Sequence, residues 1–324
     1  AVYFVGAAET AATCHPAAGD ENGRADVTLL NKSGQMVAHL HGLHRQTQAV
    51  SPHVADWLYE LAWVRREPAA APAAAPAPSM SDATVKKMFA AGSYEEIPHD
   101  NMRKTIARRL QESKSTIPHF YLTVDCDLDA LLKLRETVNA AAPVKDGKPA
   151  YKASVNDFVI KAMAMALARV PDANVTWTET AMLKHRGSDV GVAVSIPGGL
   201  ITPVVRDAHA KTISAISNEM KDFAARAKAR KLKPEEYQGG TTAVSNLGMF
   251  GIKDFCAVIN PPHATILAVG AGEQRAIVRN GALAIATVMS VTLSTDHRAV
   301  DGALGAELLK AFKDLIENPM GLLV

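Results

Sequence analysis

The residues best suited to chemistry lie near the C-terminal end of the chain, in the stretch Ser294–Gly302. An apolar run, Ile285–Leu293, precedes this stretch and a helical pattern follows it, so it is predicted to join a strand to a helix. His297 stands at the end of that strand, where a rigid element can hold an imidazole in place. Because the pKa of an ordinary histidine lies near neutrality, His297 can take a proton from a thiol or hydroxyl and return it. The other interpretation is that His297 caps the helix or fills a polar niche.

A second candidate lies upstream, in the stretch Gly239–Gly251. Its sequence, GGTTAVSNLGMFG, predicts a short strand that ends in a glycine-rich turn carrying Ser245. Ser245 can act as a nucleophile or can donate a hydrogen bond to an oxyanion. The nucleophile elbow G-x-S-x-G does not fit, since its two glycine positions hold Ala243 and Leu247. The pattern therefore favours a direct transfer in which Ser245 is a hydrogen-bond donor.

These motifs resemble the catalytic domain of the dihydrolipoamide acyltransferases, the E2 components of 2-oxo acid dehydrogenase complexes. The residues that carry the resemblance are DHRAVDG at 296–302, SNLGMFG at 245–251 and IENPMG at 316–321. The resemblance extends from about Tyr94 to Val324. It implies an α/β fold, a two-layer α+β sandwich with a mixed sheet, of the chloramphenicol acetyltransferase type.

The resemblance also implies a reaction and a role for three residues. An acyl group moves between dihydrolipoamide and coenzyme A, with His297 as the base for the incoming thiol and Ser245 as the oxyanion donor. Asp301 organises the turn behind the histidine, or it simply caps the last helix. Such a site is a channel between the subunits of a trimer, with the histidine and the serine on neighbouring chains. Arg298 is predicted to form a structural ion pair.

Substrates and partners follow from the same resemblance. Trimers are expected to form a larger cubic or dodecahedral core that binds the E1 and E3 components and lipoyl domains. Coenzyme A or acetyl-CoA is expected as a substrate, and no residue is singled out for binding it. No lipoyl-lysine motif occurs in the sequence, so the lipoyl group is expected to be supplied in trans.

The acyl group and the catalytic role each have an alternative. Pro118–Tyr121 and the ending ENPMGLLV favour the acetyltransferases of pyruvate dehydrogenase complexes over the succinyl and branched-chain types. A noncatalytic scaffold subunit of such a complex would share the fold. Relatives of that kind lack the active-site histidine, whereas His297, Ser245 and Asp301 are all present here. The sequence therefore favours an enzyme.

Length and composition restrict the class of protein. The chain has 324 residues, 48% of them hydrophobic, which is enough for one large domain and a smaller one. A net charge of +2 gives no reason to expect a nucleic-acid partner, and no run of eighteen or more apolar residues predicts a membrane span. Cys14, Cys126 and Cys256 are far apart and form no CxxC pair. They fit a reducing compartment, which is the cytoplasm, or the mitochondrial matrix if the source is eukaryotic.

Three segments are predicted along the chain. Residues 1–66 form a β-rich leader of uncertain origin, residues 67–93 an Ala/Pro-rich linker, and residues 94–324 the acyltransferase catalytic core. The leader loosely resembles the end of a polyketide synthase dehydratase domain. Because the catalytic histidine and aspartate motifs of that family are not recognisable, the leader is expected to be inactive.

The leader carries three strand patterns and a cluster of histidines. No acidic or cysteine ligand stands near His39, His41 and His44 in the sequence, so no metal site is predicted there. The predicted strands are 2–5, 25–30 and 35–43, with a hairpin turn at 32–34.

Within the core, helical patterns alternate with strand patterns. The helix that follows Asp100 has a basic face, which is either solvated or helps to hold an anionic cofactor. The predicted helices cover about 102–110, 128–139 with Asp127 as cap, 155–170 with Ser154 and Asp157 as caps, and about 213–231. The predicted strands are 117–124, 189–195, 200–206, 241–245, 264–269, 275–278 and 283–293, with hairpin turns at 196–199 and 280–281.

Overall fold

The computed structural model describes residues 10–16, 24–31, 36–44, 80–145, 147–196 and 198–324, with side chains from residue 80 onward except that of Lys145. The chain divides into two compact units, Ala1–Ala91 and Gly92–Val324. The assignment of residues 1–66 as a leader, 67–93 as a linker and 94–324 as the catalytic core stays a prediction.

The first unit contains a three-stranded antiparallel sheet in the order β1-β2-β3. Its strands are β1 (Thr10–Pro16), β2 (Arg24–Asn31) and β3 (Met36–His44). The antiparallel pairing of β2 with β3 confirms two predicted strands, and the turn predicted at 32–34 lies outside the described residues. β1 was not predicted, because its alanine-rich sequence does not alternate. The predicted strand 2–5 and the side chains of the three histidines lie outside what is described. The same unit holds the short helix α1 (Asp82–Lys86), which the hydroxyl of Ser81 caps.

A six-stranded mixed sheet forms the centre of the second unit, in the order β12-β9-β13-β14-β15-β4. β13 is parallel to both of its neighbours, β9 and β14, and the other pairs are antiparallel. The prediction of a mixed sheet is thus confirmed. The strands are β4 (His119–Asp127), β9 (Val190–Val192), β12 (Val204–Val205), β13 (Thr242–Asn246), β14 (Thr265–Arg279) and β15 (Ala282–Asp296).

Three two-stranded pairs lie outside this sheet. They are β5 (Val144–Lys145) with β6 (Lys148–Pro149), β7 (Val175–Trp177) with β8 (Met182–Lys184), and β10 (Val194–Ile196) with β11 (Gly199–Ile201).

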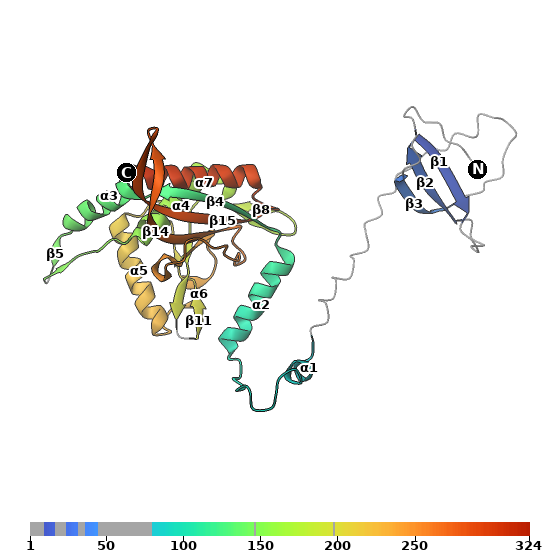
Figure 1. Ribbon diagram of the computed structural model, residues 1–324, viewed down its shortest axis with the longest axis horizontal. Coiled ribbons are helices and arrows are strands. Elements are labelled where there is room, and N and C mark those ends of the chain that lie inside the picture. Colours follow the sequence, from blue (N-terminus) through green and yellow to red (C-terminus); the bar gives the residue numbers. More distant parts are fainter. Residues whose placement is uncertain (1–9, 17–23, 32–35, 45–79, 146, 197) are drawn as a thin grey trace. The chain divides into compact units, whose positions relative to one another are not determined.

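Four helices cover one face of the sheet and give the unit its second layer (Figure 1). They are α3, α4, α5 and α7, and their apolar side chains form one core with alternate residues of the strands. The helices are α2 (Asn101–Thr116), α3 (Asp129–Ala140), α4 (Val155–Arg169), α5 (Ile213–Lys228), α6 (Pro234–Tyr237) and α7 (Gly302–Glu317), and the short 3-10 turns are η2 (Pro171–Ala173), η3 (Gly248–Phe250) and η4 (Pro319–Leu323).

α4 is the most buried of these helices and behaves as its sequence predicts. Ser154 and Asp157 form a reciprocal capping box at its start, and Pro171 follows its C-cap residue, Val170. Most of its side chains are buried, and they pack against α7, α5 and β9. This helix is therefore the rigid support behind the centre of the sheet.

The opposite face of the sheet is covered differently. A small apolar cluster there joins β13 and β14 to the irregular segment 252–262. β14 contains a bulge, where its register against β15 shifts between Val269 and Gly272. At this bulge the carbonyl oxygen of Lys253 lies only 1.8 Å from where a Cβ of Gly270 would be. The glycine therefore allows the crossing of two backbones.

The predicted division into strands is wrong at three places. The separate strands 264–269 and 275–278 are the single strand β14, which continues through the bulge between Val269 and Gly272. The strands 189–195 and 200–206 are each divided in two, and Pro203, which has no N–H to donate, stands at one interruption. At the start of α3, Leu128 makes no side-chain capping bond, whereas Oδ1 of Asp127 accepts from the backbone N–H of Asp129 at 3.0 Å. The predicted capping bond of Asp127 is therefore present.

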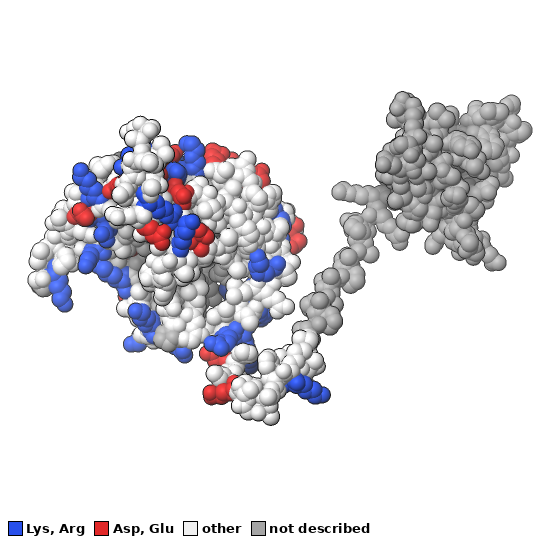
Figure 2. All heavy atoms as spheres, in the orientation of Figure 1, with Lys and Arg blue, Asp and Glu red and all other residues white. Residues whose placement is uncertain are grey.

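Charged side chains of both signs are interspersed on the face of the second unit that Figure 2 shows, and no single basic patch dominates that face. In the described part of the chain, no helix combines the length and the apolar character that crossing a membrane requires. Both described cysteines are free, and burial raises the pKa of the Cys126 thiol to about 12. Cys126 is therefore an unreactive core residue.

His263 is a buried titratable group that links the start of β14 to a glycine turn. Its side chain is 3% exposed, and its Nε2 lies 2.9 Å from the carbonyl oxygen of Gly239, so Nε2 carries the hydrogen and donates. The other ring nitrogen is buried and has no partner in the described structure. Burial lowers the pKa of His263, which means that the native state holds a neutral ring.

We predict that Gly270→Ala destabilises the fold by about 3 kcal/mol or more, because a methyl group cannot share the space of the Lys253 carbonyl. The matched control is Gly321→Ala, whose added Cβ would meet its nearest atom at 3.7 Å. Denaturant unfolding of both variants measures the difference. Equal unfolding midpoints for the two variants would contradict the prediction, because they would show that the two backbone segments can move apart.

We predict a loss of stability in mild acid that depends on His263. The unfolded chain protonates this histidine near its ordinary pKa of about 6.5, whereas the native state resists protonation until a lower pH. The unfolded state therefore binds more protons below about pH 6.5, and the free energy of unfolding falls as the pH drops through that range. The variant His263→Gln should lack the contribution of this histidine, so its free energy of unfolding should fall less over the same pH range. Unfolding measured between pH 7 and pH 5 tests it, and identical slopes for both proteins would contradict it.

Candidate active site

His297 directly follows the last residue of β15, as the sequence predicts. Its backbone N–H donates to the carbonyl oxygen of Pro118 at 3.0 Å, which ties it to the segment before β4. The imidazole is exposed and meets the ring of Phe120 edge to face, with 5.0 Å between the ring centroids. A Cβ at Gly302 would lie 3.2 Å from Phe120, so the glycine leaves room for this ring. His297 is thus held on one side and open to solvent on the other.

The two residues that flank His297, Asp296 and Arg298, form an ion pair. Asp296 is 2% exposed, and its two carboxylate oxygens accept from Nε and Nη2 of Arg298 at 2.9 and 2.8 Å. The guanidinium also lies over the ring of Trp177, 5.2 Å from its centroid. These hydrogen bonds raise the pKa of Arg298. The predicted structural ion pair of Arg298 is therefore confirmed, and Asp296 and Trp177 are contacts that the sequence did not indicate.

His119 lies beside this turn, since it pairs with Asp296 across β4 and β15. The backbone N–H of Ile259 donates to its Nε2 at 3.0 Å, so that nitrogen is an acceptor. Nδ1 then carries the hydrogen and donates to the carbonyl oxygen of Ile117 at 2.9 Å. Both nitrogens of His119 are occupied, and this histidine is a structural bridge rather than a second base.

Asp301 caps α7. Its Oδ1 accepts from the backbone N–H of Leu304 at 2.9 Å, and the residue is exposed. The structure thus shows the capping role, which holds the turn after His297 at the start of a helix. A direct part in the chemistry stays a prediction.

Ser245 lies one residue before the end of β13, where the strand leads into η3. It is half-buried, and its hydroxyl makes no hydrogen bond within the described part of the chain. Val244 belongs to the core under the helices, so alternation places Ser245 on the opposite face of the sheet. The hydroxyl is therefore available to a ligand on that face.

The structure does not bring Ser245 and His297 together within one chain. Ser245 pairs with Ala268, which pairs with Thr292, so it lies level with Thr292 two strands away. His297 is five residues beyond Thr292 along β15. With strands about 4.8 Å apart and a rise of about 3.3 Å per residue, the two Cα atoms are about 19 Å apart. A site that uses both side chains needs a second copy of the chain.

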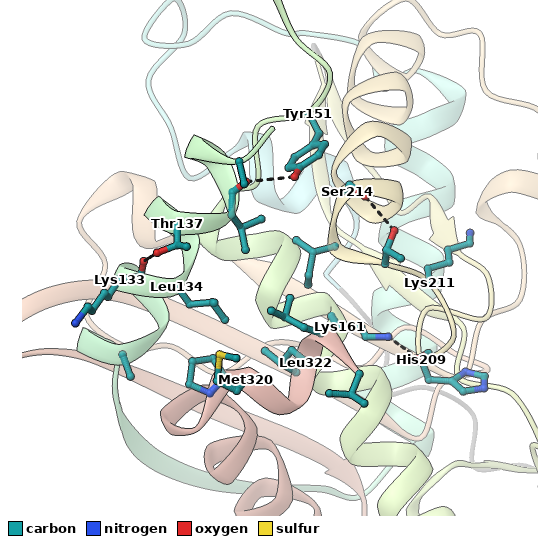
Figure 3. A pocket seen from close by; sticks show the side chains of 18 of the residues that line it. Lys133, Leu134, Thr137, Tyr151, Lys161, His209, Lys211, Ser214, Met320 and Leu322 are labelled. Atoms are coloured by element: carbon teal, nitrogen blue, oxygen red, sulfur yellow. Dashed lines mark hydrogen bonds between the residues drawn. The ribbon is translucent and has the colours of Figure 1, made fainter. Parts of the chain in front are cut away.

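A separate pocket of about 870 Å³ lies between α3, α4, the segment 209–214 and the C-terminal residues 319–324. Neither His297 nor Ser245 lines it. Figure 3 shows Lys161 reaching from α4 to the carbonyl oxygen of His209, which accepts its hydrogen bond at 2.5 Å. Burial lowers the pKa of this lysine, and no carboxylate of the described residues pairs with it. The sequence did not indicate this pocket, because Lys161 stands alone in an apolar helix.

Comparison with known proteins identifies the family. Residues 91–324 match the family described as 2-oxoacid dehydrogenases acyltransferase (catalytic domain). The match covers well over half of the chain, and the chain belongs to this family. The fold and the recognised motifs therefore agree with the resemblance that the sequence carries.

Individual relatives agree with this family. The chain is 73% identical over 248 residues to the dihydrolipoyllysine-residue acetyltransferase component of the pyruvate dehydrogenase complex of Rhizobium meliloti (strain 1021). That match covers 76% of this chain and 56% of the relative, so the chain spans little more than half the length of that protein.

Two solved structures have the same fold. A crystal structure of Azotobacter vinelandii dihydrolipoamide acetyltransferase superposes with a TM-score of 0.69 at 26% identity, covering 77% of this chain and 100% of the other. The cubic core of the pyruvate dehydrogenase multienzyme complex gives a TM-score of 0.69 at 27% identity, with the same coverage.

We predict that Arg298→Ala destabilises the protein by about 2 to 4 kcal/mol, because it leaves the buried carboxylate of Asp296 without its partner. The lower part of that range allows for the 30% exposure of the arginine side chain. The control is Lys310→Ala, which removes an exposed pair with Asp314 and should cost less than about 0.5 kcal/mol. Urea unfolding of both variants measures the difference, and similar losses in the two would contradict the role of the buried pair.

Proposed function

We propose that the chain is the acetyltransferase core of a pyruvate dehydrogenase complex, which moves an acetyl group between dihydrolipoamide and coenzyme A. The observation that carries the proposal is the pair of His297 and Ser245. Both side chains are accessible and free of internal hydrogen bonds in the described structure, yet they lie about 19 Å apart in one chain. Two neighbouring copies would bring one of each to a shared site.

The spacing of the site residues supports this assignment. In the Azotobacter vinelandii enzyme, a serine, a histidine and an asparagine have roles in the catalytic mechanism. The serine precedes the histidine by 52 positions and the asparagine follows it by four. Ser245, His297 and Asp301 have the same spacing, with an aspartate in place of the asparagine. The capping bond of Asp301 uses a carboxylate oxygen, which an asparagine amide oxygen can replace.

In the proposed reaction, His297 accepts the proton of the incoming thiol, and the thiolate attacks the carbonyl carbon of the thioester. The new C–S bond gives a tetrahedral oxyanion, to which the hydroxyl of Ser245 donates a hydrogen bond. The original C–S bond then breaks, and the leaving sulfur takes the proton back from His297. A positioned base raises the rate of such a reaction by about a hundred- to ten-thousandfold. One oxyanion donor raises it by about a hundred- to thousandfold.

The proposed assembly is a trimer that builds a larger core. The two-copy requirement and the likeness to a cubic core support a closed oligomer, although a dodecahedral core would use the same trimer. E1, E3 and lipoyl domains are the proposed partners, and the lipoyl group would be supplied by another domain or chain. The proposed location is the cytoplasm, or the mitochondrial matrix if the source is eukaryotic. A scaffold role is the alternative, and the presence of both His297 and Ser245 favours catalysis.

We predict that two inactive variants restore activity when they assemble together. His297→Ala keeps Ser245, and Ser245→Ala keeps His297. In each homo-oligomer the rate of acetyl transfer should fall by about a hundredfold or more. In equal mixed assemblies, about a quarter of sites between neighbouring chains combine both intact side chains. Transfer from acetyl-CoA to free dihydrolipoamide is measured after co-expression and purification through two different tags.

The controls separate the outcomes. Each variant purified alone reports its own background, and light scattering checks that the oligomer is unchanged. Two active single variants would overturn the roles of His297 and Ser245. Inactive variants that do not complement would place the whole site within one chain. An assembled intact chain without acetyl transfer would favour the scaffold role, once succinyl-CoA has also been tried.

A further inference from the structure

Two asparagine side chains connect the end of β13 to the first turn of α4. Asn246 follows Ser245 in the chain, and its Oδ1 accepts from the backbone N–H of Gly248 at 2.9 Å. Its Nδ2 donates to Oδ1 of Asn156 at 3.0 Å. Asn156 is the second residue of α4, the buried helix behind the sheet. The sequence analysis singled out neither asparagine, because they are 90 positions apart.

The backbone determines how both amides are oriented. A peptide N–H can only donate, so the atom of Asn246 that faces Gly248 must be its oxygen. Its NH₂ group then faces Asn156, which must present its own oxygen in return. The orientation of two amide groups thus follows from one peptide group, and each amide is held in a single orientation.

This connection lies directly beside Ser245. The other backbone attachments of the turn come from the bulged strand, since Leu247 N–H donates to Val269 and Ala271 N–H donates to Ile252. Those bonds hold the turn to its neighbour in the sheet. Only the asparagine pair, among the bonds described for this turn, ties it to the helix layer. The end of β13 is therefore fixed from two directions.

We propose that Asn246 and Asn156 are positioning residues, which hold the turn after β13 so that the hydroxyl of Ser245 points at the developing oxyanion. This inference rests on the proposed function, because it concerns the geometry of the same donor. A hydrogen-bond donor is effective only when its atom lies within hydrogen-bond distance of the charge that develops. The asparagine pair acts on Ser245 and touches neither substrate.

The test is a double-mutant cycle on acetyl transfer. Asn246→Ala and Asn156→Ala are each made in the intact chain and in Ser245→Ala. In the intact chain, each is expected to lower kcat by about tenfold with little change in KM, because a displaced donor loses effect mainly in the transition state. In Ser245→Ala, the same changes should alter kcat less than about twofold. Asn218→Ala, an exposed asparagine on α5, is the matched control.

A second set of variants uses the forced orientation of the amides. Asn246→Asp keeps an acceptor for Gly248, and Asn156 can turn its NH₂ group toward the new carboxylate. Asn156→Asp keeps the acceptor for Asn246. Combining both changes puts two carboxylates about 3 Å apart, so the double variant should lose far more kcat than the two single variants together.

The outcomes are distinguishable from failure of the proposed function. If Ser245→Ala keeps full kcat, the proposed role of Ser245 fails. If Ser245→Ala is impaired while both alanine variants of the asparagines match the Asn218 control, only this inference is overturned. Equal losses with and without Ser245 would also overturn it, because they would show a general effect on the fold. Unfolding midpoints and oligomer size are measured for every variant, and Asn156→Ala, which leaves the Gly248 bond in place, remains usable if Asn246→Ala does not fold.

Discussion

The hydrogen-bond register of β13, β14 and β15 is the constraint on which the candidate site depends. It places Ser245 on β13, two strands away from β15 and level with Thr292. His297 lies five residues further along, just past the end of β15. Sheet spacing cannot be compressed, so no loop movement within one chain closes the gap of about 19 Å. A site that uses both His297 and Ser245 therefore has to combine two copies of the chain.

Each candidate residue stands at the end of a strand, and a side-chain link fixes each strand end. Asp296 and Arg298 form a bidentate pair around His297, with Trp177 against the guanidinium. Asn246 and Asn156 form an amide pair beside Ser245. The two links differ in physical character. The first encloses a buried charge and contributes stability, whereas the second is neutral and contributes orientation.

Much of this organisation is visible in local sequence patterns. The capping box of α4, the Asn280–Gly281 turn and the position of His297 after an apolar strand each depend on residues within a few positions of one another. The errors occur where distant segments meet. Two strands were predicted where β14 is continuous, and Gly270 at its bulge is required by the carbonyl of Lys253, which is a tertiary contact. A bulge and a strand break can look alike in sequence, because glycine is common at both.

The sequence by itself determined the fold class, the family and the identity of His297, Ser245 and Asp301 as candidates, because these depend on residue types at fixed spacing. Only the tertiary structure decided that Asp301 caps α7, that His119 bridges two backbone segments and that Asn156 meets Asn246. It also decided that Ser245 and His297 are remote within one chain. The physical reason is that strand register and helix packing join residues that are far apart in the chain, and residue spacing carries no record of those pairings.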